Sequence, residues 1–229
     1  MTRKLTGASL VASLERRFVT INDDVRIGGR DINILRPRSA EDLISDSDFE
    51  RDERLPYWAE LWPSSTILAN FILTNKRRKG TLVEIGAGVG LVSIAATMAG
   101  HNVTATDYYD DALAFTRANA FRNIGREITT EHLDWRDVGS AFPRFDVVLA
   151  SDVLYESRYA PLVSDVIVRL LAPRGVAYVG DPGRVATSAF TDACLERGLA
   201  ISTRATRPYL AGKIRQTITI YEITRSGDT

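Results

Sequence analysis

The sequence predicts one doubly wound α/β domain whose mostly parallel, seven-stranded sheet ends in an antiparallel hairpin. From residue 81 onward, short apolar segments alternate with helical patterns, which is typical of a parallel sheet with helices on both faces. Two strand-like segments then close the chain without a helix between them. The length of 229 residues fits one domain with a modest extension. We expect residues 1–55 to form that extension and residues 56–229 to form the main domain.

The extension is expected to hold a helix and a β-hairpin. The helix is predicted over residues 7–18. Residues 17–36 alternate between apolar and polar side chains, with turn residues at 22–24 (Asn-Asp-Asp) and 28–29 (Gly-Gly), which predicts a hairpin or a meander. Residues 38–54 are rich in charge and are expected to form an exposed helix or loop.

The main domain is expected to begin with a helix that Ser64 or Ser65 caps and that runs to about Asn75. Strands are then predicted near residues 81–86, 102–107, 127–133, 145–151 and 174–180, and helices near 89–99, 109–123, 158–171 and 183–197. The two closing strands are predicted at 199–206 and 213–224, with residues 207–212 between them.

A glycine-rich turn follows the first strand of the main domain, where Glu84 precedes Gly86, Gly88 and Gly90. A strand that ends in glycines exposes backbone N–H groups and lets a ligand approach the main chain closely. Asp107, about twenty residues later, can bind the two hydroxyls of a ribose. The segment therefore predicts a nucleoside-cofactor site.

The spacing of the glycines disfavours a nicotinamide dinucleotide. The dinucleotide fingerprint is G-x-G-x-x-G, but here Gly90 comes one residue early and Leu91 stands at the third glycine position. A dinucleotide dehydrogenase would also repeat a second βαβαβ half, whereas this chain closes with a hairpin.

Ligands of open α/β sheets bind at the carboxyl ends of the strands, and polar or aromatic side chains follow each predicted end. They are Gly86, Ala87, Gly88 and Gly90 after the first strand, Asp107 and Tyr108 after the second, Asp134 and Trp135 after the third, Ser151, Asp152 and Tyr155 after the fourth, and Asp181 after the fifth. Such a set fits one shared cleft.

Three of these features have more than one interpretation. Asp134 and Trp135 can bind an adenine through its amine and its face, or they can cap a loop and pack in the core. Asp152 and Tyr155 can orient an amine at a methyl group, or they can cap a helix and pack. The tryptophans Trp58 and Trp62, in a segment bracketed by prolines, can form a lid over a cationic cofactor or pack inside.

Together, these motifs resemble the seven-strand protein-lysine methyltransferases of the "methyltransferase 16" family. The resemblance rests on residues 57–63, Glu84 to Gly90, Asp107, Asp134-Trp135 and the Asp152-x-x-Tyr155 motif. It implies S-adenosylmethionine (SAM) as cofactor, S-adenosylhomocysteine (SAH) as product, and Asp152 and Tyr155 at the methyl-transfer site. The implied cofactor contacts are Trp58, Trp62, Glu84, Gly86, Ala87, Gly88, Gly90, Asp107, Tyr108, Asp134, Trp135 and Ser151.

Two further segments are similar to one branch of that family, the methyltransferases of the electron-transfer-flavoprotein β subunit. They are Pro56 to Ala59 and Gly180 to Arg184. Ser151 and Leu154 depart from that branch, which more often has glycine and a bulkier aromatic there. The resemblance thus implies a protein substrate that carries a lysine. Transfer to a small amine or heterocycle, and a SAM-binding partner subunit without catalysis, stay open as alternatives.

Composition limits the remaining function classes. Basic and acidic residues number 29 each, which argues against a broad nucleic-acid surface. Cys194 is the only cysteine, and His101 and His132 are isolated, so no disulfide or metal is expected. No apolar run reaches the length of a membrane span. We expect a cytoplasmic monomer, or a mitochondrial matrix protein if the basic N-terminus is a presequence.

Overall fold

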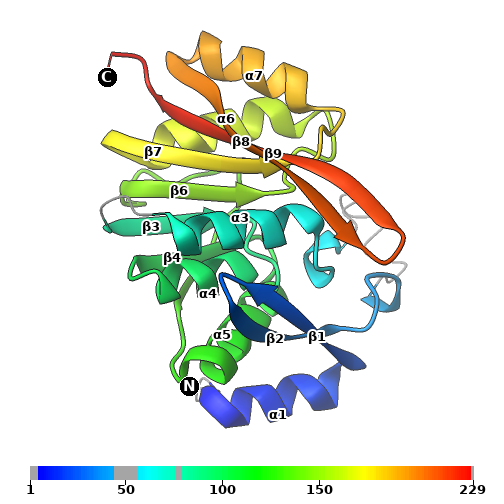
Figure 1. The fold of residues 1–229 in the computed structure, drawn as a ribbon. Coiled ribbons are helices and arrows are strands. Elements are labelled where there is room, and N and C mark those ends of the chain that lie inside the picture. Colours follow the sequence, from blue (N-terminus) through cyan, green and yellow to red (C-terminus); the bar gives the residue numbers. More distant parts are fainter. Residues whose placement is uncertain (1–4, 44–55, 76–78, 228–229) are drawn as a thin grey trace.

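A central seven-stranded sheet organises the computed structural model, which describes residues 5–43, 56–75 and 79–227 (Figure 1). Its strand order is β5-β4-β3-β6-β7-β9-β8. The strands are β3 (Thr81–Ile85), β4 (Asn102–Asp107), β5 (Thr129–His132), β6 (Phe145–Ser151), β7 (Leu171–Asp181), β8 (Leu199–Ala211) and β9 (Ile214–Arg225). The first five run parallel, and β9 pairs antiparallel with both β7 and β8. The predicted fold class is confirmed.

Helices cover both faces of this sheet, as the alternating pattern predicted. One hydrophobic cluster joins α3 (Pro63–Thr74), α4 (Leu91–Met98) and α5 (Asp110–Ile124) to the sheet, and a second joins α6 (Tyr159–Leu170) and α7 (Thr187–Glu196). Neighbouring side chains of β3 point to opposite faces of the sheet and pack in different clusters. Leu82 belongs to the first cluster, and Val83 and Ile85 belong to the second. No described helix is long and apolar enough to cross a membrane.

The closing hairpin is longer than the sequence predicted. Residues 207–211, expected as a connection, continue β8, and Pro208 pairs with Thr217 of β9. A proline is tolerated here because β8 is the edge strand and leaves one side without ladder hydrogen bonds. The turn instead uses Gly212, whose φ is +54°.

The N-terminal extension contains α1 (Gly7–Arg17) and a single hairpin of β1 (Thr20–Ile27) and β2 (Arg30–Pro37). Its turn is at Gly28 and Gly29, both with positive φ, as a two-residue hairpin turn requires. The turn expected at residues 22–24 is wrong, because these residues pair within the strand. Of the charged stretch at 38–54, a short helix η1 (Glu41–Leu43) is described, and residues 44–54 lie outside the described residues.

Two asparagines of α5 attach the hairpin to the main domain. Asn119 accepts from the Leu35 N–H at 2.8 Å and donates to the Leu35 carbonyl at 2.8 Å. Asn123, one turn later, does the same for Asn33 at 2.9 and 2.8 Å. Helix α5 thereby satisfies backbone N–H and C=O groups along one edge of β2. Leu35 also joins the same hydrophobic cluster as α3 to α5.

The hairpin also contacts residues 57–62, the aromatic segment before α3. Arg36 of β2 contacts Glu60 at 3.1 Å, and the same carboxylate accepts from the Ala40 N–H at 3.1 Å. The segment itself contains the short helix η2 (Tyr57–Ala59). Helix α3 then begins at Pro63, with Trp62 as its N-cap, so neither Ser64 nor Ser65 is the cap. Proline at the first helical position fixes a helical φ without losing a needed donor.

Candidate functional site

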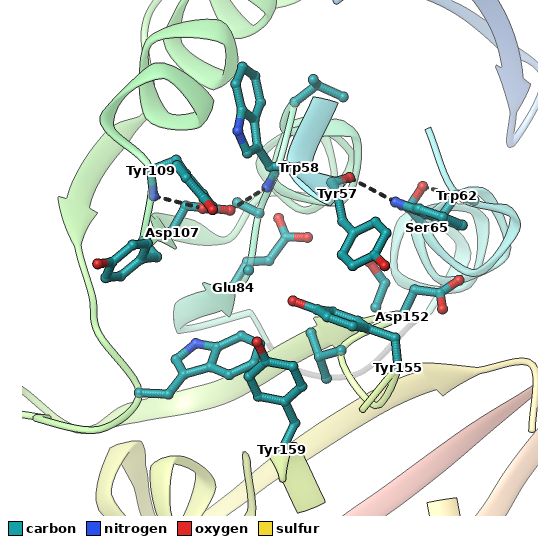
Figure 2. Close-up of a pocket in the computed structure, with 18 of the residues that line it drawn as sticks. Tyr57, Trp58, Trp62, Ser65, Glu84, Asp107, Tyr109, Asp152, Tyr155 and Tyr159 are labelled. Atoms are coloured by element: carbon teal, nitrogen blue, oxygen red, sulfur yellow. Dashed lines mark hydrogen bonds between the residues drawn. The ribbon is translucent and has the colours of Figure 1, made fainter. Parts of the chain in front are cut away.

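A pocket opens at the carboxyl ends of β3, β4 and β6, where the aromatic segment faces the sheet (Figure 2). It brings together almost all of the residues that the sequence nominated. These are Trp58, Trp62, Glu84, Gly86, Ala87, Gly88, Asp107, Tyr108, Asp134, Trp135, Ser151, Asp152 and Tyr155. Gly90 is not in the lining.

Gly88 and Gly90 of the turn each require glycine, but for different structural reasons. Gly88 has φ +54°, and a Cβ there would lie 3.1 Å from the Trp58 carbonyl oxygen, so the turn packs against the aromatic segment. A Cβ on Gly90, where φ is +90°, would lie 2.8 Å from Thr116 Oγ1. Gly90 is therefore required for the close approach of α4 and α5, and this helix contact explains why it lies outside the pocket.

Asp107 at the end of β4 is bound to the glycine turn. Its Oδ2 accepts from the Gly88 N–H at 2.9 Å and its Oδ1 accepts from the Tyr109 N–H at 3.0 Å. Burial raises the pKa of Asp107, while these two hydrogen bonds oppose the rise. The Tyr108 N–H also faces this carboxylate, and of about four acceptor positions the group keeps one for a ligand hydroxyl.

Glu84 lies at the base of the same half of the pocket with only 1% of its surface exposed. Its Oε2 accepts from Ser93 Oγ of α4 at 2.5 Å. Burial raises the pKa of Glu84 to about 8, and the bond from Ser93 offsets part of this rise. The carboxyl is therefore largely protonated near neutral pH in this structure.

Asp134 and Trp135 follow β5 on another wall of the pocket. The Asp134 carboxylate already accepts from Arg136, with Nη2 to Oδ2 at 2.6 Å and Nε to Oδ1 at 3.0 Å. The Trp135 indole covers Gly86, because a Cβ on that glycine would lie 3.2 Å from the ring. Trp135 thus lies directly against the glycine turn, while Asp134 is engaged in an ion pair beside it.

Asp152 follows β6 in the opposite half of the pocket. Its φ is +57°, in the left-handed region that aspartate tolerates better than most residues. Its N–H donates to the Gly180 carbonyl of β7 at 2.9 Å, which fixes it between the two strand ends. The carboxylate is only 2% exposed and accepts from Arg184 Nε at 2.7 Å. Burial raises the pKa of Asp152, and Arg184 opposes the rise.

A row of aromatic side chains lines this half and continues toward Trp135. Tyr57 lies 6.0 Å from Trp62 and 4.8 Å from Tyr155, measured between ring centroids. Tyr159 then lies 4.8 Å from Tyr155 and 5.4 Å from Trp135. Burial and the neighbouring Tyr159 raise the pKa of Tyr155, so its phenol stays neutral and can donate a hydrogen bond.

The two tryptophans of the aromatic segment have different environments. The Trp58 ring is directed away from the middle of the pocket, toward α5, with Phe115 at 5.7 Å (Figure 2). Trp62 donates from Nε1 to the Tyr57 carbonyl at 3.0 Å and stays at the pocket wall. Sequence analysis nominated neither Tyr57 nor Tyr159. Tyr57 is adjacent to Trp58 in the sequence, and Tyr159 comes four residues after Tyr155.

Comparison with known proteins identifies a family and relatives with similar sequences. A family model described as lysine methyltransferase matches residues 48–191. The electron transfer flavoprotein beta subunit lysine methyltransferase of Xenopus laevis is 32% identical over 135 residues, covering 56% of this chain and 53% of that protein. Protein N-lysine methyltransferase METTL21A of Danio rerio is 33% identical over 126 residues, covering 52% and 57%. The chain spans about half the length of the curated relatives it matches.

Solved structures share the fold at low sequence identity. The ribosomal protein L11 methylase of Lactobacillus delbrueckii subsp. bulgaricus has a TM-score of 0.52 at 24% identity and covers 71% of this chain and 79% of its own. The magnesium protoporphyrin IX methyltransferase of Synechocystis PCC 6803, solved with SAM, has a TM-score of 0.57 at 17% identity and covers 79% and 93%. The fold is that of the class I methyltransferases.

Proposed function

We propose, on the premise that this chain belongs to the lysine methyltransferase family, that it transfers a methyl group from SAM to the side-chain amine of a lysine in a protein substrate. One observation carries the proposal. A single pocket contains both an acid bound to a glycine turn, Asp107, and the Asp152 and Tyr155 pair with its aromatic neighbours. A nucleoside cofactor and an amine acceptor would meet there.

The first half of the pocket has the donor and acceptor groups that SAM needs. Asp107 keeps acceptor capacity for a ribose hydroxyl, and Gly86 and Gly88 leave the main chain open to a ligand. Trp135 offers an apolar face for an adenine, and Glu84 is available for the amino-acid end. When bound, SAM supplies a methyl group on a sulfonium, which a neutral amine can displace in line.

The second half would prepare the acceptor. Tyr57, Tyr155 and Tyr159 surround it with aromatic surface, and such surroundings disfavour the ammonium form of lysine and exclude water. The Tyr155 phenol oxygen, held neutral by burial, can accept from an N–H of the amine and so leave the nitrogen lone pair free to attack. Positioning and desolvation would then supply most of the acceleration.

The substrate is the least defined part of this proposal. The Xenopus laevis relative is named for the electron transfer flavoprotein β subunit, and we propose this subunit as the first candidate acceptor. A monomer that needs no nucleic acid is proposed as the active form. The lone, buried Cys194 supports a reducing location, for which we propose the cytoplasm.

Calorimetric titration of the purified protein with SAM, SAH and NAD would test the cofactor. Binding of SAM and SAH but not NAD, lost in Asp107→Ala, is expected. Tritiated SAM would then be incubated with the flavoprotein β subunit and with cell lysate, using Asp152→Ala as the blank, and label released as methyl-lysine is expected. Absence of SAM binding would overturn the proposal. Label on small amines alone would replace the protein acceptor with a small one.

A further inference from the structure

Arg184, just after β7, is the partner of Asp152 and also contacts the aromatic segment. Its Nε lies 2.7 Å from Asp152 Oδ1, and its guanidinium carbon lies 5.2 Å from the centroid of the Trp62 ring. Arg184 is not in the pocket lining, whereas Asp152 and Trp62 are. The arginine therefore contacts two lining residues, Asp152 and Trp62, without lining the pocket itself.

A second buried acid fixes the backbone from which Arg184 extends. Asp181 Oδ1 accepts from the Gly183 N–H at 2.7 Å, the Arg184 N–H at 2.9 Å and Thr187 Oγ1 at 2.6 Å. These bonds hold the connection between β7 and α7 in one conformation. Arg184 thus extends to Asp152 from a turn whose backbone is hydrogen-bonded to a buried carboxylate.

The pair belongs to a pattern of charge around the pocket. Four lining acids each contact an arginine, at 2.6–3.1 Å: Glu60 with Arg36, Asp134 with Arg136, Asp152 with Arg184 and Glu156 with Arg158. Within the described ranges, Glu84 and Asp107 are the lining acids without such an ion pair. Among the four pairs, Asp152 is the carboxylate with the least exposure, at 2%.

We propose that Arg184 is a positioning residue of the acceptor half: it holds the Asp152 carboxylate and cancels its charge at the place where the methyl group is transferred. The inference rests on the proposed function. An isolated carboxylate beside the acceptor would stabilise a lysine ammonium, which has no lone pair to attack the methyl group. With its charge cancelled, Asp152 shapes the pocket without retaining a proton on the amine.

The affinities for SAM and SAH report the net charge of the Asp152–Arg184 pair, and they can be measured without a methyl acceptor. The two ligands differ by the methyl group and its positive charge, so the ratio of the SAH Kd to the SAM Kd reports the electrostatic potential at the sulfur. Arg184→Met exposes an unbalanced carboxylate and should raise this ratio roughly five-fold, which corresponds to about 1 kcal/mol. Losing the Arg184 cation raises the pKa of Asp152 further, so the titrations are run on the alkaline side of neutral, which favours the carboxylate.

Three further variants separate charge from structure. Arg184→Lys keeps the cation and should keep the wild-type ratio. Adding Asp152→Asn to Arg184→Met removes the unbalanced charge and should return the ratio to the wild-type value. Arg197→Met is the matched control, because Arg197 Nε contacts Asp165 Oδ1 at 2.5 Å on α6, and neither residue lines the pocket.

The outcomes separate this inference from the proposed function. If wild type binds no SAM, the proposed function fails. If wild type binds both ligands but Arg184→Met weakens them equally, the arginine has a structural role alone and the inference is overturned. If Arg184→Met does not fold, the double variant Arg184→Met/Asp152→Asn decides, because it carries neither charge. A ratio equal to wild type supports the inference, and a ratio well below wild type would show that Arg184 had not cancelled the charge.

Discussion

Asp107 ends β4 and Asp152 follows β6, the two strands on either side of β3, yet the chain holds the two acids in different ways. Asp107 is bound by two main-chain N–H groups within the same turn region, at 2.9 and 3.0 Å. Asp152 is bound by a side chain from the next strand end, Arg184. The cofactor half of the pocket is thus built from local backbone, and the acceptor half from side chains that the fold brings together.

The largest effect on SAM affinity is expected for a substitution of Asp107, the acid that main-chain N–H groups bind. Asp107→Ala removes the acceptor of two main-chain hydrogen bonds and of the proposed ribose hydroxyl. Charge-assisted hydrogen bonds contribute about 1.5–3 kcal/mol each, so we expect the Kd for SAM to rise about a hundredfold or more. Calorimetric titration of the variant with SAM measures this Kd. Asp111→Ala, which removes an exposed acid of α5, should leave the Kd unchanged.

The same comparison shows what the sequence could predict. Glu84, the glycines and Asp107 lie close along the chain, so their spacing alone predicted that they would lie together. The contact of Arg184 with Asp152 spans 32 residues and a complete strand, and the contact of Asn119 with Leu35 spans 84. Such contacts depend on strand order and on where each loop is held. The C-terminal end of β8 was missed for a similar reason, because only the edge position lets the strand contain Pro208 without losing a ladder hydrogen bond.

Glu84 allows a test of the cofactor half through stability. The unfolded chain releases the Glu84 proton near its ordinary pKa of 4.5, whereas the folded chain keeps it to about 8. The free energy of unfolding therefore falls as pH rises between these values, by up to about 1.4 kcal/mol per pH unit. Below 4.5 the contribution is complete, and above 8 it is lost.

Glu84→Gln removes this titration while keeping an oxygen that can accept from Ser93. We expect wild type to lose about 2 kcal/mol more than the variant between about pH 6 and pH 8, measured by urea unfolding. Both histidines remain in both proteins, so their titration cancels in the comparison. Equal pH dependence in the two proteins would mean that Glu84 is ionised in the folded state.

In the acceptor half, the expected effect is on rate, with little change in cofactor affinity. Tyr155→Phe removes the phenol but keeps the ring that packs at 4.8 Å against both Tyr57 and Tyr159. We expect the single-turnover rate of methyl transfer to fall about tenfold, or about 1.4 kcal/mol, and the Kd for SAM to stay within about twofold. Tyr221→Phe, on β9 outside the pocket lining, is the control. A matching loss of SAM affinity would place Tyr155 in the cofactor half.

The smallest effect is expected for Asp134, which resembles Asp152 in its bonding because an arginine side chain holds it. Arg136 binds both carboxylate oxygens, and the Arg136 side chain is 49% exposed, so the pair is screened and contributes little. If Trp135 provides most of the adenine contact, Asp134→Asn should change the Kd for SAM by no more than about threefold, or about 0.6 kcal/mol. The titration uses Asp107→Ala as its upper reference. A change of about thirtyfold would instead mean that Asp134 accepts directly from the adenine amine, and that a carboxylate held by a side chain can bind the cofactor as strongly as one held by the backbone.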